Sequence, residues 1–277
     1  MTALLLALCS SLAYGCADFL GGMGARKAHV LRTVMIAAPA SLAVELLLWP
    51  FLGASFSAAA VGWGAASGIA SAAAFVLLYR TLAIGPMSVL SPVTALVSAV
   101  LPVGVGLVQG ERLSAAGLVG LPLALVAVVL VSVGSEGPAR PSRGALLLAF
   151  GAGAAIALQL ICLHQAPSDS GLAPLLTGRA VSSAATLTAA GLLYRRLGGE
   201  RPAYGMSAAA GVLDSLANLL FLLAARSGDL AVVAVITALY PAGTVLLARA
   251  VLAERIHRLQ LAGLAAAAVA VSLLALT

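Results

Sequence analysis

The sequence predicts an all-α membrane protein with ten transmembrane helices, arranged as two inverted five-helix repeats. Three observations support this fold class. Of the 277 residues, 62% are hydrophobic and only 9% are charged, whereas a soluble domain carries roughly 25% charged residues. Ten apolar runs follow one another, each close to the length of about 20 residues that crosses a bilayer. Finally, two stretches of the chain, residues 85–131 and 228–274, are similar in sequence.

The ten apolar runs lie between charged or Gly/Pro/Ser-rich breaks. They cover residues 2–22, 33–52, 58–79, 86–109, 114–133, 144–165, 172–194, 204–225, 229–251 and 257–276. The longest turn-rich connection separates the fifth run from the sixth. Because five is an odd number, the second half must enter the membrane upside down relative to the first. We therefore expect two domains, residues 1–135 and 144–277, joined by residues 136–143.

The two similar stretches align without a gap. The matched pairs include Thr94 with Thr237, Glu111 with Glu254, Arg112 with Arg255 and Gly120 with Gly263. A duplicated and strongly apolar chain is typical of a secondary transporter, whose binding site lies near the midplane between two related halves. The repeat therefore predicts transport before any single residue is considered.

One four-residue motif occurs in both halves, as Gly110-Glu111-Arg112-Leu113 and as Ala253-Glu254-Arg255-Ile256. Each copy follows a helix of small residues and precedes a helix with a glycine at its middle. On these residues the whole chain resembles the drug/metabolite transporter superfamily, specifically the bacterial EamA-type permeases of ten helices. The resemblance implies a multi-pass protein of the bacterial inner membrane that moves a small organic metabolite or drug, with export the expected direction. It also implies a central cavity between helices 3, 4, 8 and 9, and it identifies no substrate.

The charges of the loops predict an orientation that differs from the family norm. Loops after odd-numbered helices hold twelve lysines and arginines, whereas loops after even-numbered helices hold only Arg112 and Arg226. The positive-inside rule then places the odd-numbered loops in the cytoplasm and both termini outside. EamA-type permeases instead have cytoplasmic termini. We give the charge count of this chain more weight.

The sequence contains no signature of catalysis or of a cofactor. Its three histidines are far apart, and its three cysteines show neither metal-ligand nor disulfide spacing. Basic residues are scattered through short loops and form no stripe that would bind nucleic acid. We therefore expect no enzyme activity, no metal, no cofactor and no nucleic acid. A nutrient-uptake permease, a membrane enzyme and a non-transporting helper subunit remain as alternatives to export.

Ionisable residues inside the predicted helices are the main candidates for function, because a charge at bilayer depth costs roughly 2.5–3.5 kcal/mol. Asp214 falls near the middle of helix 8, with Asn218 one turn further on. We interpret Asp214 as a cation or proton acceptor and Asn218 as its neutral partner. The alternative is a structural ion pair between Asp214 and Arg179 on helix 7. Arg179 itself would bind an anionic substrate group, or neutralise Asp214 or Glu45.

Two further acids and one amide lie in the predicted helices. Glu45, near the centre of helix 2, would take part in proton coupling or in helix packing. Asp18 on helix 1 would form a cation entry site, or would be screened by the nearby Arg26-Lys27 pair. Gln159 on helix 6 would line the pathway or bond another helix. A proton is the most economical coupling ion, because a buried carboxylate can take up and release one.

Prolines predict kinks in helices 4 and 9, since proline removes a backbone hydrogen bond and frees carbonyl groups. The predicted cavity is lined by Asp214, Asn218, Tyr240, Thr94, Thr237, Ser71 and Tyr14. The paired motif residues lie at helix ends, and we expect them to cap and anchor the helices. They are Glu111, Arg112, Glu254 and Arg255.

Overall fold

The structure, a computed structural model, describes residues 2–84, 87–111, 114–132, 142–193, 197–198, 200–243 and 258–274. Over these residues the chain is helical, and the single β contact is an isolated antiparallel bridge between Ala54 and Gly171. The helices are α1 (Thr2–Lys27), α2 (Val30–Leu52), α3 (Ala58–Ile84), α4 (Met87–Val108), α5 (Ala115–Ser132), α6 (Arg143–Gln165), the 3-10 turn η1 (Ser168–Ser170), α7 (Ala173–Leu192), α8 (Tyr204–Ala225), α9 (Leu230–Thr237) and α11 (Arg258–Leu274).

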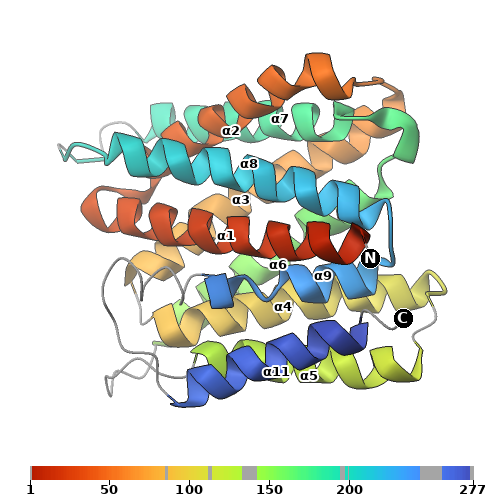
Figure 1. Cartoon of the computed structure of the whole chain (residues 1–277). Coiled ribbons are helices and arrows are strands. Elements are labelled where there is room, and N and C mark those ends of the chain that lie inside the picture. Colours follow the sequence, from red (N-terminus) through yellow and green to blue (C-terminus); the bar gives the residue numbers. More distant parts are fainter. Residues whose placement is uncertain are drawn as a thin grey trace.

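The helices lie side by side in one bundle, as Figure 1 shows. Helices α2 and α7 form one edge of the bundle, and α5 and α11 form the opposite edge. Between them α1 packs along α8, and α3 packs against both α6 and α7. The start of α1 and the end of α11 lie at the same end of the bundle. That placement agrees with an even number of passages through the bundle.

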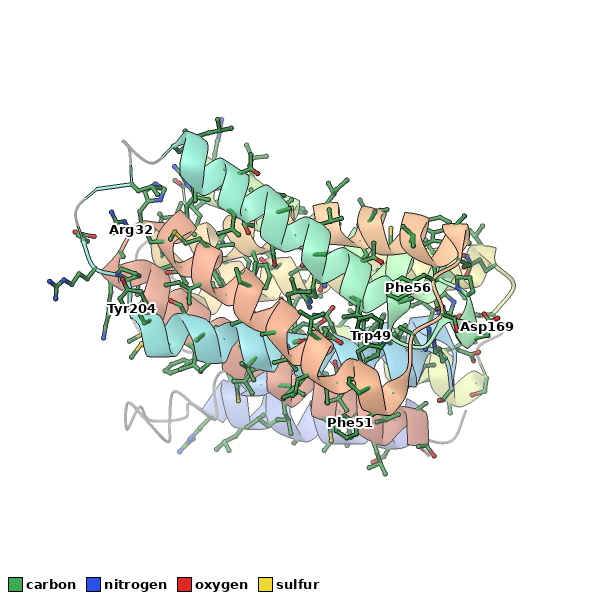
Figure 2. All side chains as sticks on the ribbon, turned by 90° about the horizontal axis from the view of Figure 1, so that it is seen from above. Arg32, Trp49, Phe51, Phe56, Asp169 and Tyr204 are labelled. Carbon is green, nitrogen blue, oxygen red and sulfur yellow. The ribbon has the colours of Figure 1, made fainter. Side chains whose placement is uncertain are left out.

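The outer surface of the bundle is apolar, as lipid contact requires. Val108 is 89% exposed and Phe51 is 81% exposed. Among the described residues five helices are long and apolar enough to cross a membrane, namely α1, α2, α3, α6 and α8. Figure 2 shows Arg32 and Tyr204 at one end of the bundle, with Phe56 and Asp169 toward the other. Exposed aromatic side chains near helix ends are typical of the membrane interface. The chain is a multi-pass membrane protein.

Most predicted helices agree with the observed ones to within a few residues, but the first is longer than predicted. Glycines suggested that it ends near residue 22, whereas α1 continues to Lys27. These glycines are sites of close contact. A Cβ atom at Gly21 would collide with the ring of Tyr79 on α3. Gly21 therefore allows the two helices to approach, and it does not end α1.

The predicted ninth helix is broken. Helix α9 ends at Thr237, residues 238–239 form a turn, and the chain is helical again from residue 240. The N–H of Leu239 donates to the Ile236 carbonyl three residues earlier at 3.1 Å, so the last turn is tightened. Pro241 has no N–H to continue the α-helical ladder. The repeat mate of Pro241 is Ser98, and there α4 runs unbroken.

Two glycine contacts set the spacing of the helices that surround the centre of the bundle. Gly68 on α3 lies against the backbone of Gly178 on α7, and a Cβ atom there would collide with the Gly178 carbonyl. Gly211 on α8 meets the Ala37 carbonyl of α2 in the same way. Small residues at such positions let transmembrane helices approach closely. The side chains one turn away are thereby brought within hydrogen-bonding distance of the next helix.

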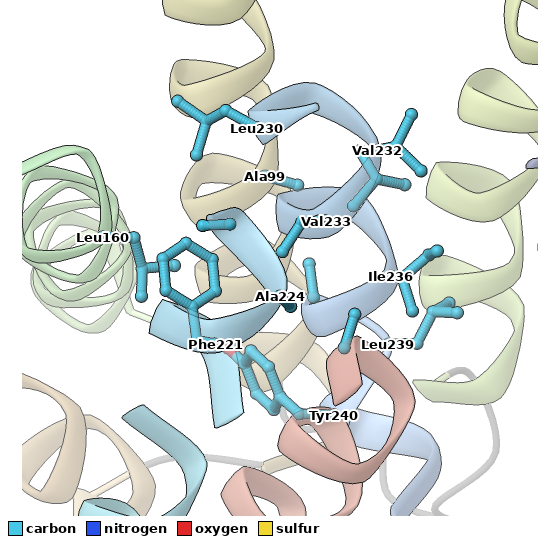
Figure 3. Close-up of a cluster of buried hydrophobic side chains, with 14 of the residues drawn as sticks. Ala99, Leu160, Phe221, Ala224, Leu230, Val232, Val233, Ile236, Leu239 and Tyr240 are labelled. Atoms are coloured by element: carbon cyan, nitrogen blue, oxygen red, sulfur yellow. The ribbon is translucent and has the colours of Figure 1, made fainter. Parts of the chain in front are cut away.

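The largest hydrophobic core surrounds α9. Figure 3 shows Val233 and Ile236 of α9 among side chains from neighbouring helices, such as Phe221. Every residue of α9 is buried. This helix is therefore enclosed by protein, which permits the break at its end, because irregular backbone at membrane depth occurs only where lipid does not reach it.

Glu111 caps the start of α9 from the end of α4. Gly110 has a φ of 94°, and the Glu111 N–H donates to the Gly106 carbonyl at 3.0 Å, which turns the chain back on itself. The Glu111 carboxylate then accepts hydrogen bonds from the N–H groups of Leu230 at 2.7 Å and Ala231 at 2.9 Å. A negative charge at a helix N-terminus is favourable.

The three other motif residues, Arg112, Glu254 and Arg255, lie outside the described residues. The glycines that support the Glu111 cap differ in the second half of the sequence. Arg249 and Ala253 stand where Gly106 and Gly110 stand in the first half. The repeat therefore preserves the glutamate without preserving its glycine surroundings.

Replacing Glu111 by Ala should lower the stability of the folded protein, because two N–H groups of α9 lose a charged acceptor. Hydrogen bonds to charged groups contribute about 1.5–3 kcal/mol each. Glu111→Gln should retain part of the stability, since the amide oxygen still accepts. The measurement is thermal unfolding of the purified protein in detergent. Glu200→Ala, which removes an exposed glutamate side chain, is the matched control. Equal unfolding temperatures for Glu111→Ala and this control would contradict the capping account.

Candidate functional site

A cavity lies at the centre of the bundle, between α1, α3, α4, α6, α8 and the broken end of α9. Its empty space, including the part open to the surroundings, is about 540 Å³. Five predicted site residues line it, namely Asp214, Tyr240, Thr237, Ser71 and Tyr14. Asp18 and Gln159 line it as well. The cavity thus draws on helices α1 and α6 in addition to the four helices that the family resemblance implied.

The ion pair between Arg179 and Asp214 lies beside this cavity. Arg179 Nη2 is 2.6 Å from Asp214 Oδ2. Its Nη1 donates to the Ser71 hydroxyl at 3.1 Å, and the guanidinium lies 5.9 Å from the centre of the Phe75 ring. The side chain of Arg179 is 3% exposed and that of Asp214 is 13% exposed. Of the pairings considered from the sequence, the structure shows Arg179 with Asp214 and not with Glu45.

Two amide side chains extend the network to α6. Gln159 Nε2 donates to Asn218 Oδ1 at 2.5 Å, and Asn218 Nδ2 donates to the Asp214 carbonyl at 2.8 Å. Asn218 lines a smaller pocket next to the main cavity, together with Arg179. The Ser67 hydroxyl of α3 donates to the Gln159 carbonyl at 3.2 Å. Helices α3, α6, α7 and α8 are therefore joined by polar contacts in one layer of the bundle.

Glu45 lies apart from the cavity, between α2 and α8. Its Oε1 accepts a hydrogen bond from the Ser215 hydroxyl at 2.7 Å, and its side chain is fully buried. Its Oε2 has no hydrogen-bond partner among the residues that the structure describes. Ser215 adjoins Asp214 in the sequence. Neighbouring residues of α8 therefore contact Glu45 on one side and Arg179 on the other.

Asp18 does not lie at the membrane boundary, and its role as a cation site stays a prediction. We expected it near the membrane boundary, screened by Arg26 and Lys27 or forming an entry site. It faces the central cavity instead and is 9% exposed. In the described part of the chain its carboxylate makes no ion pair. The turns that follow it carry Arg26 and Lys27 away to the end of α1.

The two matched threonines have different surroundings. Thr237 lines the cavity at the end of α9. The Thr94 hydroxyl donates to the Leu90 carbonyl at 3.0 Å and to the Ala149 carbonyl at 3.3 Å, and it does not reach the cavity. Since α4 is unbroken there, Thr94 faces the backbone of α6. The prediction that Thr94 lines the cavity is therefore wrong.

The sequence interpretation missed Tyr79 and Ser98, which line the cavity beside Phe75. A signal for Tyr79 was present, because Ser71, Phe75 and Tyr79 recur every four residues and so share one face of a helix. It was overlooked because residue 79 was taken as the end of the third helix. Nothing in the sequence distinguished Ser98 from other serines.

The comparisons with known proteins bear on this architecture. The model of the EamA-like transporter family matches residues 143–276. The second half of the chain belongs to the EamA-like transporter family. This confirms the family recognised from the duplicated motif, and it identifies the chain as a membrane transporter in general terms.

No curated protein matches the sequence. One solved crystal structure is similar over 99% of this chain and 96% of its own, with a TM-score of 0.75 and 14% sequence identity. At that identity the likeness shows the fold alone.

Breaking the Arg179–Asp214 pair should destabilise the protein more than removing both charges. Removal of one partner leaves the other buried and unpaired, which costs about 3–5 kcal/mol, whereas an apolar pair of similar volume is often neutral. We expect Asp214→Leu and Arg179→Met each to lower the unfolding temperature, and the double variant to recover most of the loss. Thermal unfolding of the three purified variants measures this. Additive losses in the double variant would show that the two charges do not depend on each other.

Proposed function

We propose that the chain is a secondary transporter that moves a small organic metabolite or drug through the central cavity by alternating access. The observation that carries the proposal is the cavity itself, which is enclosed among helices from both halves of the chain and adjoins a buried ion pair. Helix α9 breaks at this level, and broken helices at the midplane are typical binding sites in secondary transporters. The membership of residues 143–276 in a transporter family supports the same conclusion.

The helix packing supports two inverted repeats, residues 1–135 and 144–277, in which ten helices cross the membrane. Helix α1 packs on α8 as its repeat mate α6 packs on α3, and α2 packs on α8 as α7 packs on α3. The mates α4 and α9 pack on each other, as do α2 and α7. Interchanging the two halves leaves these pairings unchanged, as a two-fold axis in the membrane plane requires. Rocking of one half against the other would then expose the cavity to each side in turn.

In this proposal Asp214 is the coupling residue. Protonation of its carboxylate would weaken the contact with Arg179 and loosen the polar layer between α3, α7 and α8. Tyr14, Ser71, Thr237 and Tyr240 would contact the solute from the cavity wall, and Asn218 would hold Asp214 in place. Glu45 would serve as a second proton acceptor on α8's other side. Export of the solute is the direction that family analogy favours.

We place the protein in the bacterial inner membrane with both termini outside. Described basic residues gather at the end of the bundle where α1 ends and α2, α6, α8 and α11 begin, as Arg32 does in Figure 2. The positive-inside rule puts that end in the cytoplasm. A reporter fused to the C-terminus that proves cytoplasmic would contradict this orientation.

Proteoliposomes test the proposed function. Purified protein is reconstituted with a pH-sensitive dye inside, and amino acids, sugars, nucleosides and aromatic cations are added outside one at a time. We expect at least one compound to produce a protein-dependent change of internal pH, because solute and proton movement are coupled. Asp214→Asn should abolish the pH change while remaining folded and correctly inserted. Asp169→Asn, at the exposed η1 turn, should behave as wild type.

Two outcomes would contradict this account. If no compound changes the internal pH and none is taken up as a radiolabelled solute, the chain is not a transporter of these solute classes. If a solute is taken up without any pH change, transport stands but proton coupling through Asp214 fails. Loss of folded Asp214→Asn protein would assign Asp214 a structural role.

A further inference from the structure

The cavity presents one carboxylate that no described cation neutralises. Asp18 and Asp214 both line it, and Asp214 is paired with Arg179. Asp18 makes neither an ion pair nor a hydrogen bond with any residue in the described ranges. When all three side chains are ionised, two negative charges face one positive charge. A buried charge without a partner is costly in a membrane, and a ligand of opposite charge would remove that cost.

Aromatic rings line the same cavity as this carboxylate. Tyr14 lies one turn before Asp18 on α1, Tyr79 comes from α3, and Tyr240 comes from the chain that follows α9. All three rings line the cavity that Asp18 faces. The faces of aromatic rings attract cations, and they do so more strongly when water is excluded. A carboxylate that shares a cavity with three phenol rings is therefore suited to a positively charged group.

The single arginine of the site is not free to bind an anion. One of its terminal nitrogens forms the ion pair with Asp214, the other donates to the Ser71 hydroxyl, and the guanidinium lies over the ring of Phe75. Arg179 is not among the residues that line the main cavity, and it lines the smaller pocket beside it. A carboxylate-bearing ligand would have to displace Asp214 from a 2.6 Å contact. The arrangement thus favours cations over anions and over zwitterions.

Part of the cavity wall is apolar, although Ser71, Ser98, Gln159 and Thr237 also line it. Leu78, Ile156, Leu160 and Ala234 line it together with the ring of Phe75. A ligand that fits both parts carries a positive charge at one end and a hydrophobic or aromatic body at the other. Ring-on-ring contact with Phe75 would add to the binding energy of an aromatic body.

We propose that the substrate is a small hydrophobic organic cation, an arylalkylamine or a related ammonium compound, whose charged nitrogen binds Asp18 between Tyr14, Tyr79 and Tyr240. This inference rests on the proposed function and assigns its substrate class. It also gives the two acids of the cavity different roles, since Asp18 binds the ligand while Asp214 pairs with Arg179. The positive charge of the ligand is therefore required for binding.

Three ligands that share one phenyl ring test the proposal. Phenethylamine is a cation, phenylalanine is a zwitterion and 3-phenylpropionate is an anion at neutral pH. Binding of each to the purified full-length protein is measured by calorimetry, with wild type, Asp18→Asn and the control Asp229→Asn. Asp229 is an exposed residue just before α9 and makes no side-chain capping bond. Because Asn is close in size to Asp and α1 is held by other contacts, Asp18→Asn should fold, which its thermal unfolding verifies.

We expect phenethylamine to bind wild type and Asp229→Asn equally, and to bind Asp18→Asn at least tenfold more weakly, a difference of about 1.4 kcal/mol. Phenylalanine and 3-phenylpropionate should bind at least tenfold more weakly than phenethylamine. Tighter binding of either carboxylate compound, no binding of phenethylamine to wild type, or unchanged binding of phenethylamine to Asp18→Asn would each overturn the proposal.

The same three compounds, offered to proteoliposomes as radiolabelled solutes, separate this proposal from the function on which it rests. Uptake of phenylalanine or 3-phenylpropionate without uptake of phenethylamine would leave the chain a transporter and would overturn the substrate class. Uptake of phenethylamine that Asp18→Asn abolishes would support both.

Discussion

A buried charge needs a buried partner, and the pairing of Arg179 with Asp214 is the constraint on which the centre of this bundle depends. Either side chain alone would destabilise the fold by several kilocalories per mole. The close contact of Gly68 with Gly178 brings α3 and α7 together, so that Ser71 reaches the same guanidinium. The glycine contacts thus hold the helix backbones close enough for side chains of α3 and α8 to reach Arg179.

The break in α9 is the second feature that shapes the site. A helix of eight residues has few hydrogen bonds of its own, and α9 is stabilised from both ends and from all sides. Glu111 caps its first turn, and buried neighbours enclose it. Its free end then places Thr237 and Tyr240 at the cavity. Because the cap comes from the end of α4, a movement of α4 would be transmitted to α9 directly.

The positions of the helices were predictable from the sequence, since apolar runs of membrane length are a strong signal and the duplication supported their number. The residues that face the cavity were predictable only in part. Asp214, Tyr14 and Ser71 were found because polar residues in apolar helices are conspicuous. Thr94 was misplaced because identity between two repeats does not ensure identical surroundings when only one mate, α9, is broken by a proline.

Asp18 shows the limit of reading charges along the chain. The sequence places it close to Arg26 and Lys27, but distance along a helix is not distance in space. Two turns of α1 separate the acid from those bases, and packing against α3 and α9 turns it toward the cavity. The composition of a site that six helices build cannot be obtained from any one of them.

Labelling of a single cysteine in the cavity tests the central claim most directly. In a variant whose three native cysteines are replaced by serine, Thr237 is changed to cysteine. A membrane-impermeant maleimide is then added to right-side-out or to inside-out vesicles. If the two halves of the chain expose one cavity alternately, the cysteine is labelled from both sides, though not at the same rate. Labelling from only one side, under every pH and solute condition, would contradict alternating access through this cavity.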